Sequence, residues 1–315
     1  MPDQVCCVCG DPASDLIGQR WFCGKHFQSA KRERPHTWRM SILLVVGLVV
    51  FVGIVYALDL VLHPALTGIG LVLAGVILAL VPALLWLVFF YLQDRLEPEP
   101  KGYILGVFLL GALLASAVGI PLVENLYHVS KWIYTDTATT ILGSILVVGF
   151  IQEFLKYAAV RFSVFPSAEF DEATDGVIYA TAAGLGYATV LNLQFVIANG
   201  GVVLGSSVIR MAVVALAQAS FAGITGYFLG RARFENKPWW WMSFGLSVAA
   251  VCNGLFNWLR GRIVQRGISL TGPTTNPWMG LALASVVALI TLGMILWLIR
   301  RNIRTALAEK LELEK

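Results

Sequence analysis

Long uninterrupted blocks of apolar residues recur along this chain of 315 residues. A helix rises about 1.5 Å per residue, so about 20 consecutive apolar residues cross the hydrocarbon core of a bilayer. Hydrophobic residues make up 57% of the chain and charged residues only 13%, which excludes an ordinary soluble domain or a disordered chain. The net charge of +4 is too small for a surface that binds nucleic acid. The sequence therefore predicts an all-α protein, a polytopic bundle of transmembrane helices in the lipid bilayer.

The apolar blocks give about eight candidate spans. We expect them near residues 40–62, 66–92, 103–127, 138–160, 175–198, 204–230, 239–259 and 277–299. Pro82 and Pro121, in the second and third spans, predict local kinks. Small residues crowd the 175–198 span, which predicts close packing against neighbouring helices. The bundle then occupies residues 40–300, and a short charged tail follows at 301–315.

Basic residues predict which loops face the cytoplasm, because cytoplasmic loops carry an excess of Lys and Arg. If both termini are cytoplasmic, most of the 23 basic residues lie on that side, including those of a basic linker at residues 29–39. The loop that contains Arg260, Arg262 and Arg266 departs from this rule. We therefore expect a multi-pass protein of the cell (plasma) membrane whose N- and C-termini lie in the cytoplasm.

Cysteines and a histidine gather ahead of the first span. The pairs Cys6-x2-Cys9 and Cys23-x2-His26 have the spacing with which two short turns present four ligands to one zinc ion. In a reducing cytosol, metal binding is favoured over disulfide formation. Residues 1–28 are thus predicted to be a zinc-binding head, in which the zinc is structural because protein ligands fill all four positions. The alternative is a disordered, redox-sensitive tail.

Several polar side chains lie inside the expected spans, where ionisable groups are costly and are functional hypotheses by default. Glu153 and Lys156 are three residues apart, so they share a helix face and can pair. Asn253 and Asn257 are four apart and stack on one face. Together with neighbouring amides, these side chains could line one polar cavity among the fourth to seventh spans. Each could instead be only an interhelical hydrogen bond that stabilises the bundle.

Five segments in the same order carry a resemblance to a known family. They are residues 94–100, 152–156, 175–187, 218–230 and 253–257. Through them, the region 85–260 resembles the PrsW family of intramembrane proteases, which is related to the CAAX-protease/Abi superfamily. The resemblance implies a helical membrane fold whose central spans hold a hydrolytic site, dependent on a metal or on glutamate.

The resemblance also shows what this chain has changed. Neutral side chains stand at six of the family's motif positions: Gln152, Tyr187, Leu191, Gln218, Asn253 and Asn257. They replace the family's glutamates, histidines and aspartate, together with one phenylalanine. Of the residues that the resemblance would make catalytic, only Glu153 persists, with Lys156 as its companion. Amides are poor zinc ligands and these spans contain no histidine, so we expect no catalytic metal there.

Three functions follow from these features. We favour a catalytically degenerate relative, a pseudoprotease, that binds a transmembrane helix of a partner protein while the zinc head binds a cytosolic protein. The first alternative is an active intramembrane metalloprotease or endopeptidase, with Asp175 or Glu124 assisting Glu153. The second alternative is a small-solute transporter with the amide-lined cavity as its path, although the chain lacks the internal repeats typical of transporters.

Overall fold

The computed structural model describes residues 5–6, 9, 11–17, 20–31, 35–62, 68–92, 99–198 and 204–266, with single positions beyond them. Its elements, in chain order, are β1 (Asp15–Ile17), β2 (Arg20–Phe22), α1 (Gly24–Lys31), α2 (Pro35–Leu62), α3 (Gly68–Tyr91), α4 (Lys101–Leu114), η1 (Ala115–Gly119), η2 (Pro121–Leu126), α5 (Val129–Trp132), α6 (Thr137–Gly143), η3 (Ser144–Gly149), α7 (Phe150–Arg161), α8 (Asp175–Ala198), α9 (Leu204–Phe234) and α10 (Trp241–Arg266). The elements labelled η are π-helical turns.

The predicted helical membrane bundle is confirmed. Within the described residues, 6 helices are long and apolar enough to cross a membrane: Gly68–Tyr91, Lys101–Trp132, Thr137–Arg161, Asp175–Ala198, Ser207–Phe234 and Trp241–Leu259. The helix α2 adds a shorter apolar stretch, Val46–Val61, where the first span was expected. The last expected span, 277–299, lies outside the described residues apart from single positions, and so does the tail.

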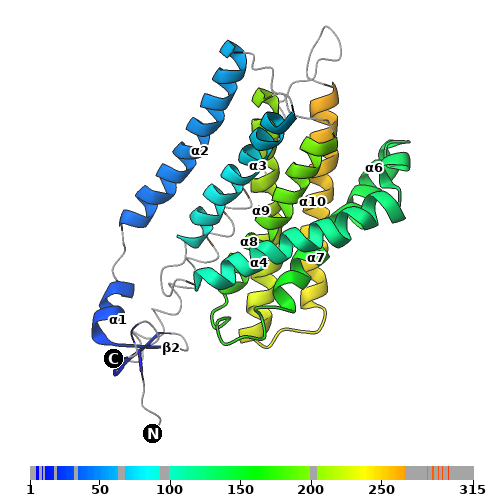
Figure 1. Cartoon of the computed structure of the whole chain (residues 1–315). Helices are drawn as coiled ribbons and strands as arrows, with labels where there is room; N and C mark the ends of the chain where they lie inside the picture. Colours follow the sequence, from blue (N-terminus) through cyan, green and yellow to red (C-terminus); the bar gives the residue numbers. More distant parts are fainter. Residues whose placement is uncertain are drawn as a thin grey trace.

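Helix α8 lies at the centre of the bundle. It packs against α9, α4 and α3, while α10 and α2 pack against α9 (Figure 1). The small residues of α8 make this possible: Gly176 lies against the backbone of Gly226 and Gly230 on α9, and Gly186 lies against the backbone of Phe108 on α4. The prediction of a close-packing face on this span is therefore confirmed.

Two spans contain π-helical turns. Helix α4 continues through η1 and η2, and helix α6 continues through η3 into α7. Pro121 is the first residue of η2, so the irregularity predicted there is present, whereas α3 continues through Pro82. A π-turn contains an extra residue and leaves some backbone groups shifted out of register, and such turns are frequent at functional sites.

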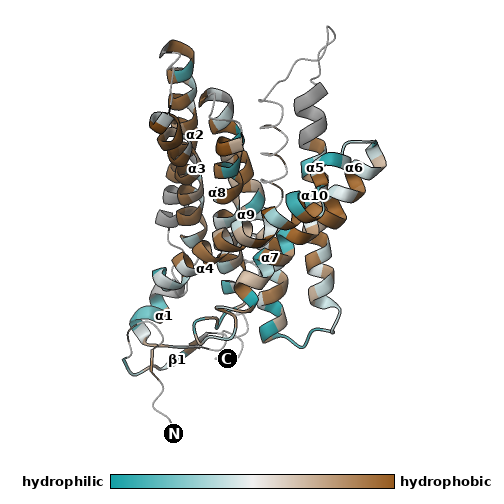
Figure 2. Cartoon of the chain, turned by 45° about the vertical axis from the view of Figure 1, so that its right-hand side comes forward, coloured by the Kyte–Doolittle hydropathy of each residue, from teal (hydrophilic) through white to brown (hydrophobic). Residues whose placement is uncertain are grey.

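The outer surface and the head differ in polarity. Apolar residues cover α2, α3 and α4, and polar residues gather on α1 and around α5 (Figure 2). The strands β1 and β2 form an antiparallel hairpin, which α1 follows. This head lies beyond the N-terminal end of α2, at the same end of the bundle as the loops 162–174 and 235–240 (Figure 1).

Candidate functional site

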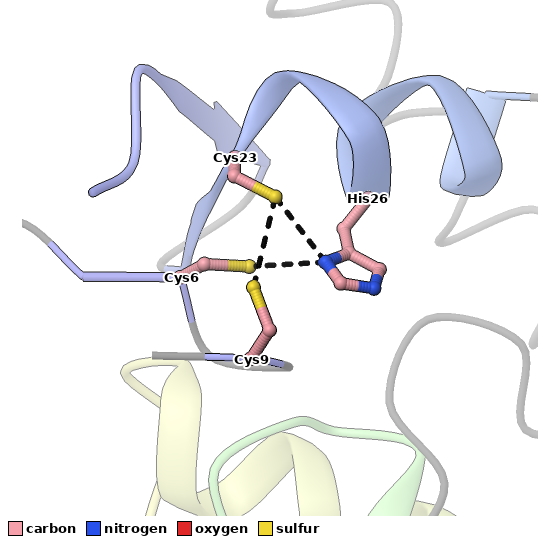
Figure 3. A group of neighbouring side chains, drawn as sticks. All are labelled: Cys6, Cys9, Cys23 and His26. Atoms are coloured by element: carbon pink, nitrogen blue, oxygen red, sulfur yellow. Dashed lines mark hydrogen bonds between the residues drawn. The ribbon is translucent and has the colours of Figure 1, made fainter. Parts of the chain in front are cut away.

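The head brings its four predicted ligands together. Cys23 directly follows β2, and α1 presents His26 one turn later, while Cys6 and Cys9 come from the preceding segment (Figure 3). One ligand atom from each residue lies within 4.8 Å of all the others. The Cys6 backbone N–H donates to the Asp11 carbonyl at 2.7 Å, which helps to hold the first segment in place.

The distances in the head fit a tetrahedral metal site. The sulfur atoms of Cys9 and Cys23 are 3.8 Å apart, and the His26 Nδ1 atom lies 3.2 Å from Cys23 Sγ and 3.6 Å from Cys6 Sγ. Zinc bonds of about 2.3 Å to sulfur and about 2.0 Å to nitrogen separate two sulfurs by about 3.8 Å, and a sulfur from a nitrogen by about 3.5 Å. The described cysteines form no disulfide. The donor set therefore fits a closed, structural zinc site.

A second cluster of polar side chains lies inside the membrane bundle. It joins α7, which carries Gln152, Glu153 and Lys156, to Gln218 on α9 and to Asn253 on α10. All five side chains are buried. Residues that are as much as 101 positions apart in the sequence therefore meet in one hydrogen-bond network, as the interpretation of one shared polar site requires.

An ion pair forms the centre of this network. The Lys156 Nζ atom donates to Glu153 Oε1 at 2.5 Å and to Gln218 Oε1 at 2.7 Å. Neither Glu153 nor Lys156 is exposed to solvent. The remaining carboxylate atom, Glu153 Oε2, is buried and has no hydrogen-bond partner in the described part of the chain. A buried ion pair depends on both partners, because removing one leaves an uncompensated charge in a medium of low dielectric constant.

Amides surround the ion pair. Gln218 Nε2 donates to Gln152 Oε1 at 2.9 Å, and Asn253 Nδ2 donates to the same oxygen at 3.0 Å. Asn253 Nδ2 also donates to Glu153 Oε1 at 2.7 Å. Asn257 joins the edge of the network, since its Nδ2 atom donates to Asn253 Oδ1 at 2.9 Å. These amides keep the hydrogen bonds of the site and carry no charge.

The two other motif positions named from the sequence lie next to the network on α8. The ring of Tyr187 is buried, with its centroid 5.9 Å from Lys156 Nζ. The Tyr187 hydroxyl lies against Gly119 of η1. Leu191 is half-buried and makes apolar contacts with Leu155 and its neighbours. The structure therefore brings Tyr187 to the ion pair, whereas Leu191 supplies only apolar surface.

A cavity of about 680 Å³ adjoins the network. Four of the motif residues line it: Gln152, Tyr187, Leu191 and Asn257. Its remaining wall comes from η1, η2, α5, α6 and η3 and from Gln194 and Trp258. Two acids, Glu124 and Asp136, are the charged residues of this lining. From the sequence, Glu124 was expected only as a possible assistant to Glu153, and Asp136 was not singled out.

A separate group of acids lies at the start of α8. Asp175 Oδ2 accepts the backbone N–H groups of Asp171 at 2.7 Å and Glu172 at 2.6 Å, which holds the preceding loop against the first turn of α8. The Tyr179 hydroxyl donates to Glu99 Oε2 at 2.5 Å. Carboxylate atoms of Glu99, Asp171 and Asp175 lie within 4.8 Å of one another. Asp175 therefore has a structural role at this helix end and does not join the network around Glu153.

Comparisons with known proteins bear on the bundle. The family model described as PrsW family intramembrane metalloprotease matches residues 99–297. The curated Protease PrsW of Geobacillus kaustophilus is 31% identical over 193 residues, which cover 60% of this chain and 79% of that protein. Protease PrsW of Bacillus subtilis is 29% identical over 180 residues, 56% of this chain and 78% of that protein. No solved structure matches.

Proposed function

This chain belongs to the PrsW family, and we propose that it keeps the family's membrane scaffold but binds a membrane partner without hydrolysing it. The observation that carries this proposal is the hydrogen-bond network around Glu153. Its Oε1 atom is held by Lys156 and Asn253, and the positions around it offer amides. Such an arrangement stabilises the packing of α7, α9 and α10, and it supplies neither a second carboxylate nor a histidine to assist a hydrolytic step.

The metal implied by the family's description does not fit these residues. A catalytic zinc site needs about three ligands from histidine and carboxylate side chains together with an open position. The network offers one carboxylate, and an ammonium group lies 2.5 Å from its Oε1 atom, where it would repel a cation. Groups of three or more metal-ligating side chains occur in the described residues only in the head and beside Asp175, and neither includes Glu153.

A single carboxylate is a poor substitute for the complete set of catalytic residues of a hydrolase. Glu153 could act as a general base only if water reached it, and a general base needs partners that orient the water and stabilise the developing charge. Loss of several members of a catalytic unit is not rescued by the one that remains. The surviving features of the site, a cavity of about 680 Å³ and neutral hydrogen-bonding groups, instead suit binding.

We also propose that the head holds one structural zinc ion through Cys6, Cys9, Cys23 and His26, and that it binds a cytosolic protein. The tetrahedral distances between these ligands support the zinc. We also propose that the protein lies in the plasma membrane with a cytoplasmic N-terminus. The position of the head supports this orientation, because the head lies at the same end of the bundle as the loops 162–174 and 235–240 (Figure 1), in or beside which Arg161, Arg231, Arg233 and Lys237 lie. Basic segments of this kind mark the cytoplasmic side.

Capture of membrane segments tests this function. The full-length protein in liposomes would carry a photo-crosslinker at Leu191 in the cavity wall, and a panel of transmembrane peptides would be added. We expect crosslinked peptides to be recovered at full length by mass spectrometry. A matched crosslinker at the lipid-facing Leu109 of α4 should capture far less. Equal capture at both positions, or recovery of cleaved fragments at Leu191, would contradict the proposal.

A further inference from the structure

The cavity beside the network has two chemically different ends. The exposed Asp136 and its neighbours Thr135 and Thr137 form one end, on the hairpin between η2 and α6. Gln152 and Asn257 lie at the other end, next to the ion pair. From residue 137 to residue 152 the chain is one continuous helical span, so the two ends are separated by roughly 20 Å.

The ion pair fixes the direction in which the inner amides point. Lys156 Nζ has only donors, so it requires the oxygen of Gln218, and the nitrogen of Gln218 then faces Gln152. Gln152 Oε1 therefore accepts from Gln218 and Asn253, and the Nε2 group of Gln152 points away from both. This Nε2 group makes no hydrogen bond with any described residue. Gln152 lines the cavity and is only 7% exposed, so its N–H donors are presented there.

The ion pair also fixes the direction of the amides on α10, and it leaves a hydrogen-bond acceptor at the cavity. Glu153 Oε1 can only accept, so it requires the nitrogen of Asn253, whose oxygen then accepts from Asn257 Nδ2. The Oδ1 atom of Asn257 makes no hydrogen bond with a described residue, and Asn257 lines the cavity. The inner end thus presents one amide NH2 group as a donor and one carbonyl oxygen as an acceptor, which together complement the C=O and N–H groups of a peptide backbone.

The outer end of the cavity favours a positively charged group on whatever binds there. Glu124 lines the cavity, and its carboxylate makes no ion pair or hydrogen bond with the described residues. Asp136 is also part of the lining, whereas the nearby basic side chains His128 and Lys131 are not. Two carboxylates without a basic residue in the wall favour a cationic group at this end.

We propose that this cavity binds an unwound, extended segment of a partner's membrane helix, with a lysine or arginine of that segment at the acidic end. The inference rests on the proposed function and specifies its partner. A regular transmembrane helix satisfies its backbone groups internally, so free donors and acceptors in the cavity call for a segment that has lost this pairing. About six extended residues span roughly 20 Å, which matches the distance between the two ends.

Peptide binding to the full-length protein in nanodiscs tests the inference. The probe is a fluorescent apolar peptide with a central Gly-Pro pair, which disfavours helix, and one terminal lysine; binding is measured by fluorescence anisotropy. A second peptide has glutamate in place of the lysine, and a third has N-methylated central peptide groups. We expect the lysine peptide to bind about three- to fivefold more tightly than the glutamate peptide. N-methylation should weaken binding about three- to tenfold, because it removes N–H donors.

Variants of the protein show which residues cause the preference for the lysine peptide. In a protein that carries both Glu124→Gln and Asp136→Asn, the preference for the lysine peptide should disappear. Asparagine also caps helices, so the second substitution preserves the start of α6. The matched control is Glu169→Gln, which removes a carboxylate from the loop between α7 and α8, outside the cavity lining, and should leave the preference intact.

The other outcomes separate the inference from the proposed function. The inference is overturned if the lysine and glutamate peptides bind with equal affinity, or if the N-methylated peptide binds as tightly as the unmethylated lysine peptide. In either case, binding itself still supports the proposed function. Failure of every peptide to bind overturns both. Cleavage of the peptides overturns the proposed function, and the order of affinities then supports or overturns the inference on its own.

Discussion

Asn253 Nδ2 lies 2.7 Å from Glu153 Oε1, and this contact ties α10 to α7 in the interior of the bundle. Lys156 donates to the same carboxylate oxygen from one turn further along α7. One acid therefore serves as the common acceptor for an amide and an ammonium group. The charges of Glu153 and Lys156 therefore hold α7 against α9 and α10 through hydrogen bonds to Gln218 and Asn253.

Removing one member of the ion pair should destabilise the bundle. Lys156→Met leaves Glu153 charged and buried, and we expect a loss of about 3–5 kcal/mol in the free energy of unfolding. Adding Glu153→Gln should recover part of that loss, because the second change removes the uncompensated charge. Unfolding in detergent of the wild type, both single variants and the double variant gives the coupling energy. Additive effects of the two substitutions would show that the pair does not act as a unit.

The head should bind one zinc ion per chain. We expect elemental analysis of the purified full-length protein to find zinc, and Cys9→Ser to remove it because a ligand is lost. Cys252→Ser is the matched control, since Cys252 is a free cysteine on α10 outside the cluster, and it should retain the metal. Zinc that stays at full stoichiometry in Cys9→Ser would place the metal elsewhere.

The contact between α8 and α9 should tolerate no added side chain. A Cβ atom at Gly176 would collide with backbone atoms of Gly226 and Gly230. We therefore expect Gly176→Ala to destabilise the protein by about 1–3 kcal/mol or more. Gly106→Ala in α4 is the control, because no atom lies near its added Cβ, and it should be neutral or stabilising by up to about 1 kcal/mol. Thermal unfolding of both variants checks this; equal behaviour would contradict the close packing.

The start of α6 should become less stable in acid. Asp136 Oδ1 accepts the backbone N–H of Thr139 at 2.9 Å, and its Oδ2 accepts the Thr139 hydroxyl. These hydrogen bonds hold the pKa of the Asp136 carboxyl below its ordinary value of 3.8. Because the pKa is lower in the folded state, the stabilisation is complete above the ordinary pKa and is lost as the pH falls through the folded-state pKa.

A comparison of variants across pH measures this cap. Asp136→Ala should unfold at a lower temperature than the wild type near neutral pH, and the gap should close in strong acid, below the folded-state pKa. Asp136→Asn retains a capping side chain without the titrating carboxyl, so its own cap should not change with pH. A gap between the wild type and Asp136→Ala that is constant at every pH would show that the carboxylate charge is irrelevant to the cap.

The bilayer explains why so much of the fold could be predicted from the sequence. Its thickness sets the length of an apolar span, and small residues such as Gly176 and Gly186 mark the helix that others approach closely. The π-turn at Ser144–Gly149 could not be predicted, since it contains no proline, and the close approach of its Gly149 to the backbone of Ala250 joins residues far apart in the sequence. Pro121 gave a visible signal for η2, but it could not specify the type of turn.

The polar site, like the fold, could be predicted only in part from the sequence. The spacing of Glu153 and Lys156 predicted their pairing, because three residues on a helix bring two side chains together. The orientation of the Gln152 amide depends on a chain of hydrogen bonds from α9 and α10, which no local pattern encodes. The acidic end of the cavity was missed for a related reason: Asp136 looks like an ordinary helix cap until α8 and α10 close the opposite wall.

The most direct test of the central claim is peptide-bond turnover by the full-length protein in liposomes, with zinc supplied. The protein and its Glu153→Gln variant would be incubated with transmembrane peptides, and products would be quantified by mass spectrometry. The account predicts that both proteins give the same background rate, because the network around Glu153 supplies no hydrolytic unit. A rate above background that disappears in Glu153→Gln would contradict it.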